Sequence, residues 1–247
     1  MALREELEQL GNWFFRWRSY LPLFLIVLFL IALRTVEYPV YPEFSGRAWE
    51  LSCLIVSLLG LVIRMYAAAC APRGSSGRNV KEQRACVLNT TGMYSITRHP
   101  LYLGNFLIWV GISLFVKSWW LALATIFIFW FYYEKVMYAE EEFLRREYGD
   151  AFLNWANVTP LFLPLDLTKW RPPALPFEFK NALRREYSGF FGIVSAFSVL
   201  KLFQDRLAHG EFVFDLVWSV IFAFSLIVYM TLLVLKKKTN LLDVQGR

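Results

Sequence analysis

Two polar stretches, each beside a long apolar block, hold the residue types that can do chemistry in this chain. Residues 92–105 (GMYSITRHPLYLGN) contain an adjacent arginine and histidine, Arg98 and His99. Residues 134–148 (EKVMYAEEEFLRREY) contain three consecutive carboxylates, Glu140–Glu142. A guanidinium, an imidazole and carboxylates held together can bind the opposite charges of a small zwitterionic ligand and can move a proton.

The two stretches are expected to lie side by side, because the chain between them predicts a tight helical hairpin. The apolar blocks 101–116 and 119–133 are separated only by Lys117 and Ser118, and two helices joined by so short a connection run antiparallel. Pro100 suits the first position of the first helix, where a missing N–H loses nothing. The hairpin therefore predicts that the arginine–histidine pair faces the three carboxylates.

The residues beside these groups favour a ligand that also has an aromatic part. Glu140 and Glu141 lie about 100° apart on a helix, so they can contact different groups of one ligand. Gly104 leaves the backbone open to a flat ligand. Three aromatic residues flank the charged groups, namely Tyr94, Tyr102 and Trp155.

The composition is typical of a membrane protein. Hydrophobic residues make up 57% of the 247 residues and charged residues 19%, whereas soluble domains hold about 45–50% and about 25%. The apolar residues gather in six blocks that suit bilayer spans, at residues 20–33, 49–71, 101–116, 119–133, 189–203 and 212–235. This pattern predicts an all-α fold, a polytopic transmembrane helical bundle of about six spans.

The basic residues predict the orientation. With the N-terminus in the cytoplasm, the cytoplasmic segments hold 20 of the 26 lysines and arginines and the opposite segments hold 4. Cytoplasmic loops of membrane proteins carry such an excess, so both termini are predicted to be cytoplasmic. The basic residues of these loops account for the net charge of +6, so this charge does not predict a nucleic-acid partner. The three cysteines have no C-x-x-C spacing, so neither a disulfide framework nor a metal site is predicted.

A basic segment after the fourth block predicts a short helix at the membrane surface. Residues 177–187 (FEFKNALRREY) combine helical spacing of apolar residues with basic ones, as interfacial helices do. This helix and the basic loop at 73–98 suit an anionic lipid headgroup, because arginine binds phosphate in a bidentate way. The candidate acceptor-binding residues are Arg73, Arg84, Trp155, Arg184 and Arg185. The same charges also satisfy the topology, and both interpretations stay open.

Three motifs in order resemble a known superfamily. Residues 98–104 (RHPLYLG) match R-H-P-x-Y-x-G, residues 140–149 (EEEFLRREYG) match E-E-x-x-L with a glycine five residues later, and residues 160–164 (PLFLP) match P-x-x-x-P. Over residues 92–164, the chain resembles the isoprenylcysteine carboxyl methyltransferase and phospholipid methyltransferase superfamily of integral membrane enzymes. It departs mildly from the family pattern at Met93, Tyr148, Phe152, Trp155 and Thr159.

The resemblance implies S-adenosylmethionine bound in a cytoplasm-facing pocket. The sequence accordingly contains no G-x-G-x-x-G fingerprint of a Rossmann domain. By their places in the motifs, Arg98 and Glu141 would be the catalytic residues. The cofactor would be bound by Tyr94, His99, Pro100, Tyr102, Gly104, Asn105, Glu140, Pro160, Phe162 and Pro164.

The resemblance leaves the methyl acceptor open. Methyl transfer from a sulfonium is an in-line displacement, which gains mainly from alignment of the methyl group and the nucleophile. A carboxylate or phosphate needs no general base, whereas an amine would need Glu141 or His99 to take its proton. The expected partner is a membrane lipid or lipid-linked substrate. The favoured acceptor is an acidic group, such as an isoprenylcysteine carboxylate or a lipid A phosphate, and a phospholipid amine is the alternative.

Two other function classes stay open. An NADPH-dependent sterol-type membrane reductase is loosely similar in the motif region. A transporter or structural protein is disfavoured, because the spans hold few charges and no matched pair of broken helices. The expected organisation is an N-terminal two-span region at 1–90, a catalytic core at 91–175, and the interfacial helix with two final spans at 176–247. The oligomeric state is left open.

Overall fold

The computed structural model describes residues 2–17, 20–35, 43–72 and 87–244, and all regular structure in these residues is helical. The elements are α1 (Leu3–Trp17), α2 (Leu21–Thr35), α3 (Glu43–Ala69), η1 (Met93–Ser95), α4 (Pro100–Phe115), α5 (Trp119–Tyr148), α6 (Asp150–Val158), η2 (Leu167–Lys169), α7 (Phe179–His209) and α8 (Leu216–Lys238). One isolated backbone bridge joins Gly92 and Arg171. The all-α prediction is confirmed.

Six apolar helices build the membrane bundle. Within the described residues, α3 from Gly46 onward, α5, α7 and α8 are long and apolar enough to cross a bilayer, and α2 and α4 are shorter apolar helices. The 30 residues of α5 extend for about 45 Å, which exceeds the roughly 30 Å hydrocarbon core of a bilayer. The chain is therefore a polytopic integral membrane protein, and part of α5 projects beyond the membrane core.

A tight turn joins α4 to α5, as the sequence predicts. Lys117 has a φ of 62°, a left-handed conformation that is uncommon for a residue with a side chain. Two hydrogen bonds close the turn, from Val116 N to Ser113 O (3.3 Å) and from Lys117 N to Leu114 O (3.0 Å). The two helices therefore run antiparallel, and the beginning of α4 lies beside the polar end of α5.

Small residues allow α3 and α4 to approach closely. A Cβ atom added to Gly104 would lie 2.6 Å from the carbonyl oxygen of Gly60 and 2.5 Å from Cγ of Arg64. A Cβ atom added to Gly111 would lie 2.2 Å from Oγ of Ser57. Membrane helices pack on such small residues because lipid supplies no hydrophobic force between helices. Gly104 thus has a packing role, and its contact with a cofactor stays a prediction.

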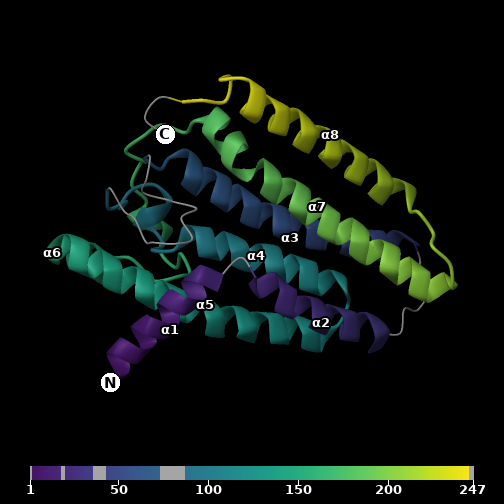
Figure 1. The fold of residues 1–247 in the computed structure, drawn as a ribbon, viewed down its shortest axis with the longest axis horizontal. Coiled ribbons are helices and arrows are strands. Elements are labelled where there is room, and N and C mark those ends of the chain that lie inside the picture. The colour runs from purple at the N-terminus through teal and green to yellow at the C-terminus, as the bar shows by residue number, and fades with distance from the viewer. Residues whose placement is uncertain (1, 18–19, 36–42, 73–86, 245–247) are drawn as a thin grey trace.

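Figure 1 shows how the other helices are arranged around this pair. α7 packs on α3, α8 lies along α7, and α1 packs on α5. The rings of Phe115, Phe197 and Trp218 contact one another and join α4, α7 and α8. The beginning of α1 and the end of α8 lie toward the same end of the bundle, at the left of Figure 1.

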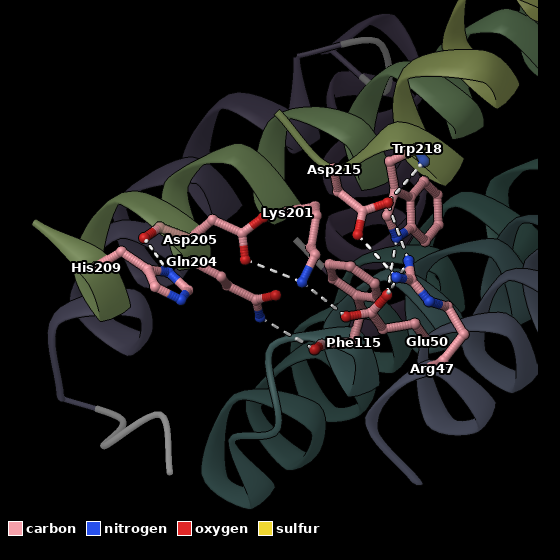
Figure 2. A network of polar contacts seen from close by, with 9 residues as sticks. All are labelled: Arg47, Glu50, Phe115, Lys201, Gln204, Asp205, His209, Asp215 and Trp218. Atoms are coloured by element: carbon pink, nitrogen blue, oxygen red, sulfur yellow. Dashed lines mark hydrogen bonds and ion pairs between the residues drawn. The ribbon is translucent and has the colours of Figure 1, made fainter. Parts of the chain in front are cut away.

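A group of charged side chains, here called the distal network, ties the helices together at the end far from η1 (Figure 2). It consists of Arg47, Glu50, Lys201, Asp205 and Asp215. Nζ of Lys201 lies 3.0 Å from Oε1 of Glu50 and 2.9 Å from Oδ1 of Asp205. Nη2 of Arg47 lies 2.9 Å from Oδ2 of Asp215, which also caps α8. The network therefore joins the ends of α3, α7 and α8.

One segment differs from the sequence-based prediction. Residues 177–187 do not form a separate interfacial helix, because α7 begins at Phe179 and continues without a break to His209. No proline interrupts this range. Asn181 and Glu186 are buried, and the amide of Asn181 donates to the carbonyl of Ala68 at the end of α3 (3.1 Å). These contacts hold the segment inside the bundle rather than along a surface.

Candidate active site

The arginine–histidine pair and the carboxylates meet where α4 begins, as the hairpin predicts. Glu141 bridges both partners: its Oε2 accepts from Nη1 of Arg98 (2.9 Å), and its Oε1 lies 3.0 Å from Nε2 of His99. The other ring nitrogen of His99, Nδ1, lies 3.8 Å from Oε2 of Glu140. The His99 side chain is buried, so this pairing is shielded from water. Groups from the two polar stretches thus form one charged cluster.

A strip of aromatic and polar side chains leads from the charged cluster into the bundle. The hydroxyl of Tyr102 donates to Oε2 of Glu140 (2.9 Å), and its ring stacks on His99 at a centroid distance of 5.6 Å. Tyr102 also contacts the ring of Tyr133 at 5.0 Å, and the amide of Asn105 donates to the Tyr133 hydroxyl (3.4 Å). His99, Tyr102 and Asn105 recur at three-residue spacing, so they share one side of α4.

One donor in the charged cluster has no protein partner. Within the described residues, Nε of Arg98 is buried and makes no hydrogen bond, although Nη1 of the same guanidinium holds Glu141. A buried donor left unsatisfied costs about 1–3 kcal/mol. A guanidinium that keeps one buried N–H unused is suited to bind an anionic group of a ligand.

The segment after α6 closes one side of the charged cluster. The backbone N–H of Arg98 donates to the carbonyl of Pro160 (2.9 Å), and the hydroxyl of Thr97 donates to the carbonyl of Phe162 (2.7 Å). The ring of Phe162 is buried against Phe106, with centroids 5.7 Å apart. The structure therefore places Pro160 and Phe162 next to the charged cluster, and Pro164, two residues farther along, is partly buried.

Tyr94 and Trp155 join η1 to α6. Nε1 of Trp155 donates to the carbonyl of Tyr94 (2.9 Å), which fastens α6 to η1. Burial raises the pKa of the Tyr94 phenol above its ordinary value, and the negative charge of Glu140 acts in the same direction. The phenol therefore stays protonated. A pocket of about 710 Å³ opens beside these elements, and its lining includes Thr90, Ser95, Trp155, Thr159, Trp170 and Arg171.

The candidate acceptor-binding arginines have partners of their own. Nη1 of Arg184 lies 2.8 Å from Oδ1 of Asp243, and Nη1 of Arg185 donates to the carbonyl of Ala68 (3.3 Å). The charge of Arg185 lowers the pKa of the Tyr94 phenol, against the larger effect of burial, so Arg185 lies on the side of the bundle that holds the site. Its contact with an acceptor stays a prediction. The remaining two candidates, Arg73 and Arg84, lie outside the described residues.

Two ion pairs beside the site were not predicted. Nε and Nη2 of Arg64 donate to Glu186 (3.0 and 2.9 Å), and Nη1 donates to Oδ1 of Asn105, which joins α3, α4 and α7 behind the polar strip. Arg4 of α1 pairs with the buried carboxylate of Glu142. An arginine inside an apolar block is a signal that it has a partner, because an unpaired charge in a membrane is costly. The sequence does not say which residue the partner is.

Comparison with known proteins gives one family and several relatives. Residues 52–151 match the phospholipid methyltransferase family. Protein-S-isoprenylcysteine O-methyltransferase B of Arabidopsis thaliana is 32% identical over 114 residues, which are 45% of this chain and 57% of that protein. Protein-S-isoprenylcysteine O-methyltransferase of Saccharomyces cerevisiae is 30% identical over 137 residues, 52% of this chain and 57% of that protein.

A third relative has a different name. The nickel-cobalt-cadmium resistance protein NccN of Alcaligenes xylosoxydans xylosoxydans is 34% identical over 111 residues, 45% of this chain and 49% of that protein. The chain spans about half the length of the curated relatives it matches. No solved structure matches it.

The matched family segment coincides with the site. It runs from α3 through α4 and α5, and it contains the arginine, the histidine and the carboxylates of the charged cluster. The family match covers the first two of the three motifs found in the sequence, and the isoprenylcysteine methyltransferase relatives agree with the resemblance. This segment therefore matches the phospholipid methyltransferase family, and the chain is similar to protein-S-isoprenylcysteine O-methyltransferases of several organisms.

Proposed function

We propose that this protein is a membrane-embedded methyltransferase that uses S-adenosylmethionine and methylates a lipid or a lipid-linked acceptor. The observation that carries the proposal is the charged cluster of Arg98, His99 and Glu141, with an unused buried N–H on the arginine. When bound, the cofactor would supply a methyl group on a sulfonium, which a nucleophile attacks in line while the neutral thioether leaves. The family match supports the methyltransferase class.

The residues present fit the charged half of such a cofactor. Its methionine portion carries a carboxylate and an ammonium group. Arg98 would bind the carboxylate through its unused Nε–H, because charge-assisted hydrogen bonds are the stronger kind. Glu140 would bind the ammonium group, while Glu141 keeps Arg98 and His99 in place.

The aromatic half of the cofactor would lie between the polar strip and the segment after α6. Tyr94, Tyr102 and Phe162 supply rings, and the backbone hydrogen bond from Arg98 to Pro160 fixes that segment against the charged cluster. The protein's own contribution is then positioning: it holds the methyl donor in one orientation and excludes water from the buried side.

The contacts of His99 agree best with an acidic acceptor. Both ring nitrogens of His99 face carboxylates, at 3.0 and 3.8 Å, so the imidazole serves as a positioning group. A phosphate or carboxylate nucleophile needs no proton acceptor. For an amine acceptor, as in phospholipid N-methylation, Glu141 would have to take the proton. We therefore favour an acidic lipid-linked group and keep the phospholipid amine as the alternative.

We infer that the site lies at the cytoplasmic face, with both termini on that side. The excess of basic residues in the corresponding loops supports this orientation. The acceptor would enter sideways from the lipid, while the cofactor would enter from the cytosol.

The test begins with cofactor binding by the purified protein in detergent. S-adenosylhomocysteine should bind, and NADPH should not. Binding of NADPH alone would favour a membrane reductase, and binding of neither would favour a transporter or a structural protein. Incubation with labelled S-adenosylmethionine and total membrane lipids should then label a lipid acceptor. A labelled phosphate or carboxylate ester supports the favoured acceptor, and a labelled phospholipid amine supports the alternative.

A further inference from the structure

Helix α1 has three faces of different character. One face packs on α5: Gly11 and Phe15 are buried, and a Cβ atom added to Gly11 would lie 2.2 Å from the carbonyl oxygen of Lys135. The second face is polar and exposed, with Gln9 and Arg16. The third face is apolar and exposed, with Leu3, Leu10, Trp13 and Trp17, whose exposed fractions are 71%, 48%, 54% and 48%.

The apolar face runs along the whole helix and also carries the exposed Glu6. Leu3, Leu10 and Trp17 follow one another at seven-residue spacing, which returns to nearly the same side of a helix at about 100° per residue. Trp13 lies one turn from Trp17, and their rings are in contact at 6.0 Å. A helix with an apolar face, a polar face and tryptophans is typical of the membrane–water interface.

α1 crosses α5 where the apolar part of α5 gives way to its polar end. The Tyr132 hydroxyl, in the apolar part of α5, donates to the carbonyl of Phe14. Arg4 pairs with Glu142, ten residues farther along α5, which corresponds to about 15 Å of helix. α1 therefore extends from the edge of the apolar layer to the polar end of α5, and the apolar helix α2 begins soon after it, at Leu21.

We propose that the face formed by Leu3, Leu10, Trp13 and Trp17 is a lipid-binding surface, and that it lies in the membrane interface at the end of the bundle that holds the candidate active site. Glu6 lies on the same side of α1 and is exposed. This carboxylate disfavours anionic lipid, so the surface suits zwitterionic headgroups. The proposal depends on the membrane fold and not on the methyltransferase function.

This surface has a consequence for the carboxylates of the site. Arg4 holds Glu142, and Glu8 holds Arg146 at 2.6 Å, so α1 is fastened to the segment of α5 that also carries Glu140 and Glu141. Lipid bound by α1 therefore holds this segment at the membrane surface. A substrate dissolved in the membrane would then meet the site at the depth of the membrane surface, where this segment of α5 lies.

The test measures the surroundings of single positions on α1 by electron paramagnetic resonance. The three native cysteines are replaced by alanine, a nitroxide is attached to a cysteine at one position, and the protein is placed in phosphatidylcholine vesicles. Leu10→Cys and Trp13→Cys probe the apolar face, and Gln9→Cys and Arg16→Cys are matched controls on the polar face. The ratio of collisions with oxygen, which partitions into lipid, to collisions with a water-soluble nickel chelate should be several-fold higher at positions 10 and 13.

Two results would overturn the proposal. One is a ratio at position 10 equal to that at position 9, which would place the apolar face in water. The other is protection of position 10 from both reagents, which would place a protein surface, such as a second copy of the chain, over it. Addition of anionic lipid should leave the ratios unchanged.

A second measurement needs no substitution. Phosphatidylcholine with a photoreactive acyl chain should label the tryptic peptide 5–16, which Arg4 and Arg16 delimit. Failure to label this peptide, while peptides of the spans are labelled, would contradict a lipid-binding surface on α1.

Discussion

Substitution of Arg98 by methionine tests the centre of the proposed site. The change keeps an unbranched side chain and removes the guanidinium, which holds Glu141 through Nη1 and leaves Nε unused. If the carboxylate of the cofactor accepts from Nε and one Nη, two charge-assisted hydrogen bonds are lost, at about 1.5–3 kcal/mol each. The sum, about 3–6 kcal/mol, corresponds to a rise of roughly 10²- to 10⁴-fold in the Kd, at about 1.36 kcal/mol per factor of ten.

The same substitution should change the stability of the ligand-free protein little. The lost pair with Glu141 destabilises the protein by about 1.5–3 kcal/mol, and removal of the unsatisfied buried N–H recovers about 1–3 kcal/mol. Glu141 keeps His99 as a partner at 3.0 Å. The Tm without ligand should therefore stay within a few degrees of the parent.

The assay is equilibrium binding of labelled S-adenosylhomocysteine to the purified protein in detergent, together with the Tm of each variant. Arg145→Met is the matched control, because Arg145 lies on the same helix as Glu141 and is exposed, 3.6 Å from Glu142. The control should bind like the parent. A Kd for Arg98→Met within about threefold of the parent, which is only about 0.65 kcal/mol, would refute the assignment. Loss of affinity together with a large fall in Tm would show a structural role instead.

Three further predictions concern packing, the acceptor and topology. Gly60→Ala would place a methyl group 2.4 Å from the carbonyl oxygen of Gly104, so thermal unfolding should show a loss of about 1–3 kcal/mol. Gly192→Ala would place a methyl group in open space beside α7, so this variant should be neutral or more stable by up to about 1 kcal/mol. Replacement of both Arg184 and Arg185 by glutamine should raise the KM for the lipid acceptor with little change in affinity for S-adenosylhomocysteine, and an equal loss of both would contradict a role in acceptor binding. A tag at either terminus should resist protease added to the outside of intact cells, and cleavage of either tag would contradict the predicted orientation.

The charged cluster could be predicted from the sequence, because it follows from the short connection between two neighbouring helices. Lys117 and Ser118 leave no room for any connection other than a hairpin, and the distance of 2.9 Å between Arg98 and Glu141 confirms the result. The membrane class could also be predicted from the sequence, because a long apolar block indicates a helix that lies in lipid, whichever helices pack around it. Both inferences use information that lies close together in the chain.

Contacts between distant helices were not predicted. Glu186 lies 122 positions after its partner Arg64, and helical periodicity identifies a buried face without naming what covers it. The sequence also failed to predict that residues 177–187 continue into the long helix α7. A basic segment with apolar residues at helical spacing fits both a separate surface helix and the first turns of a span. The role of α1 depends on α5, since only the packed structure separates its protein-facing side from its exposed apolar side.

The distal network determines where the bundle can open. Removal of one partner from a buried ion pair destabilises a protein by about 3–5 kcal/mol, and Glu50 and Asp205 are both buried beside Lys201. Separation of α3, α7 and α8 at that end would break these pairs at once. Because the Arg64–Glu186 pair and the hydrogen bond from Asn181 to Ala68 also tie the start of α7 to α3, a lipid tail that enters the bundle must pass elsewhere than between these two helices.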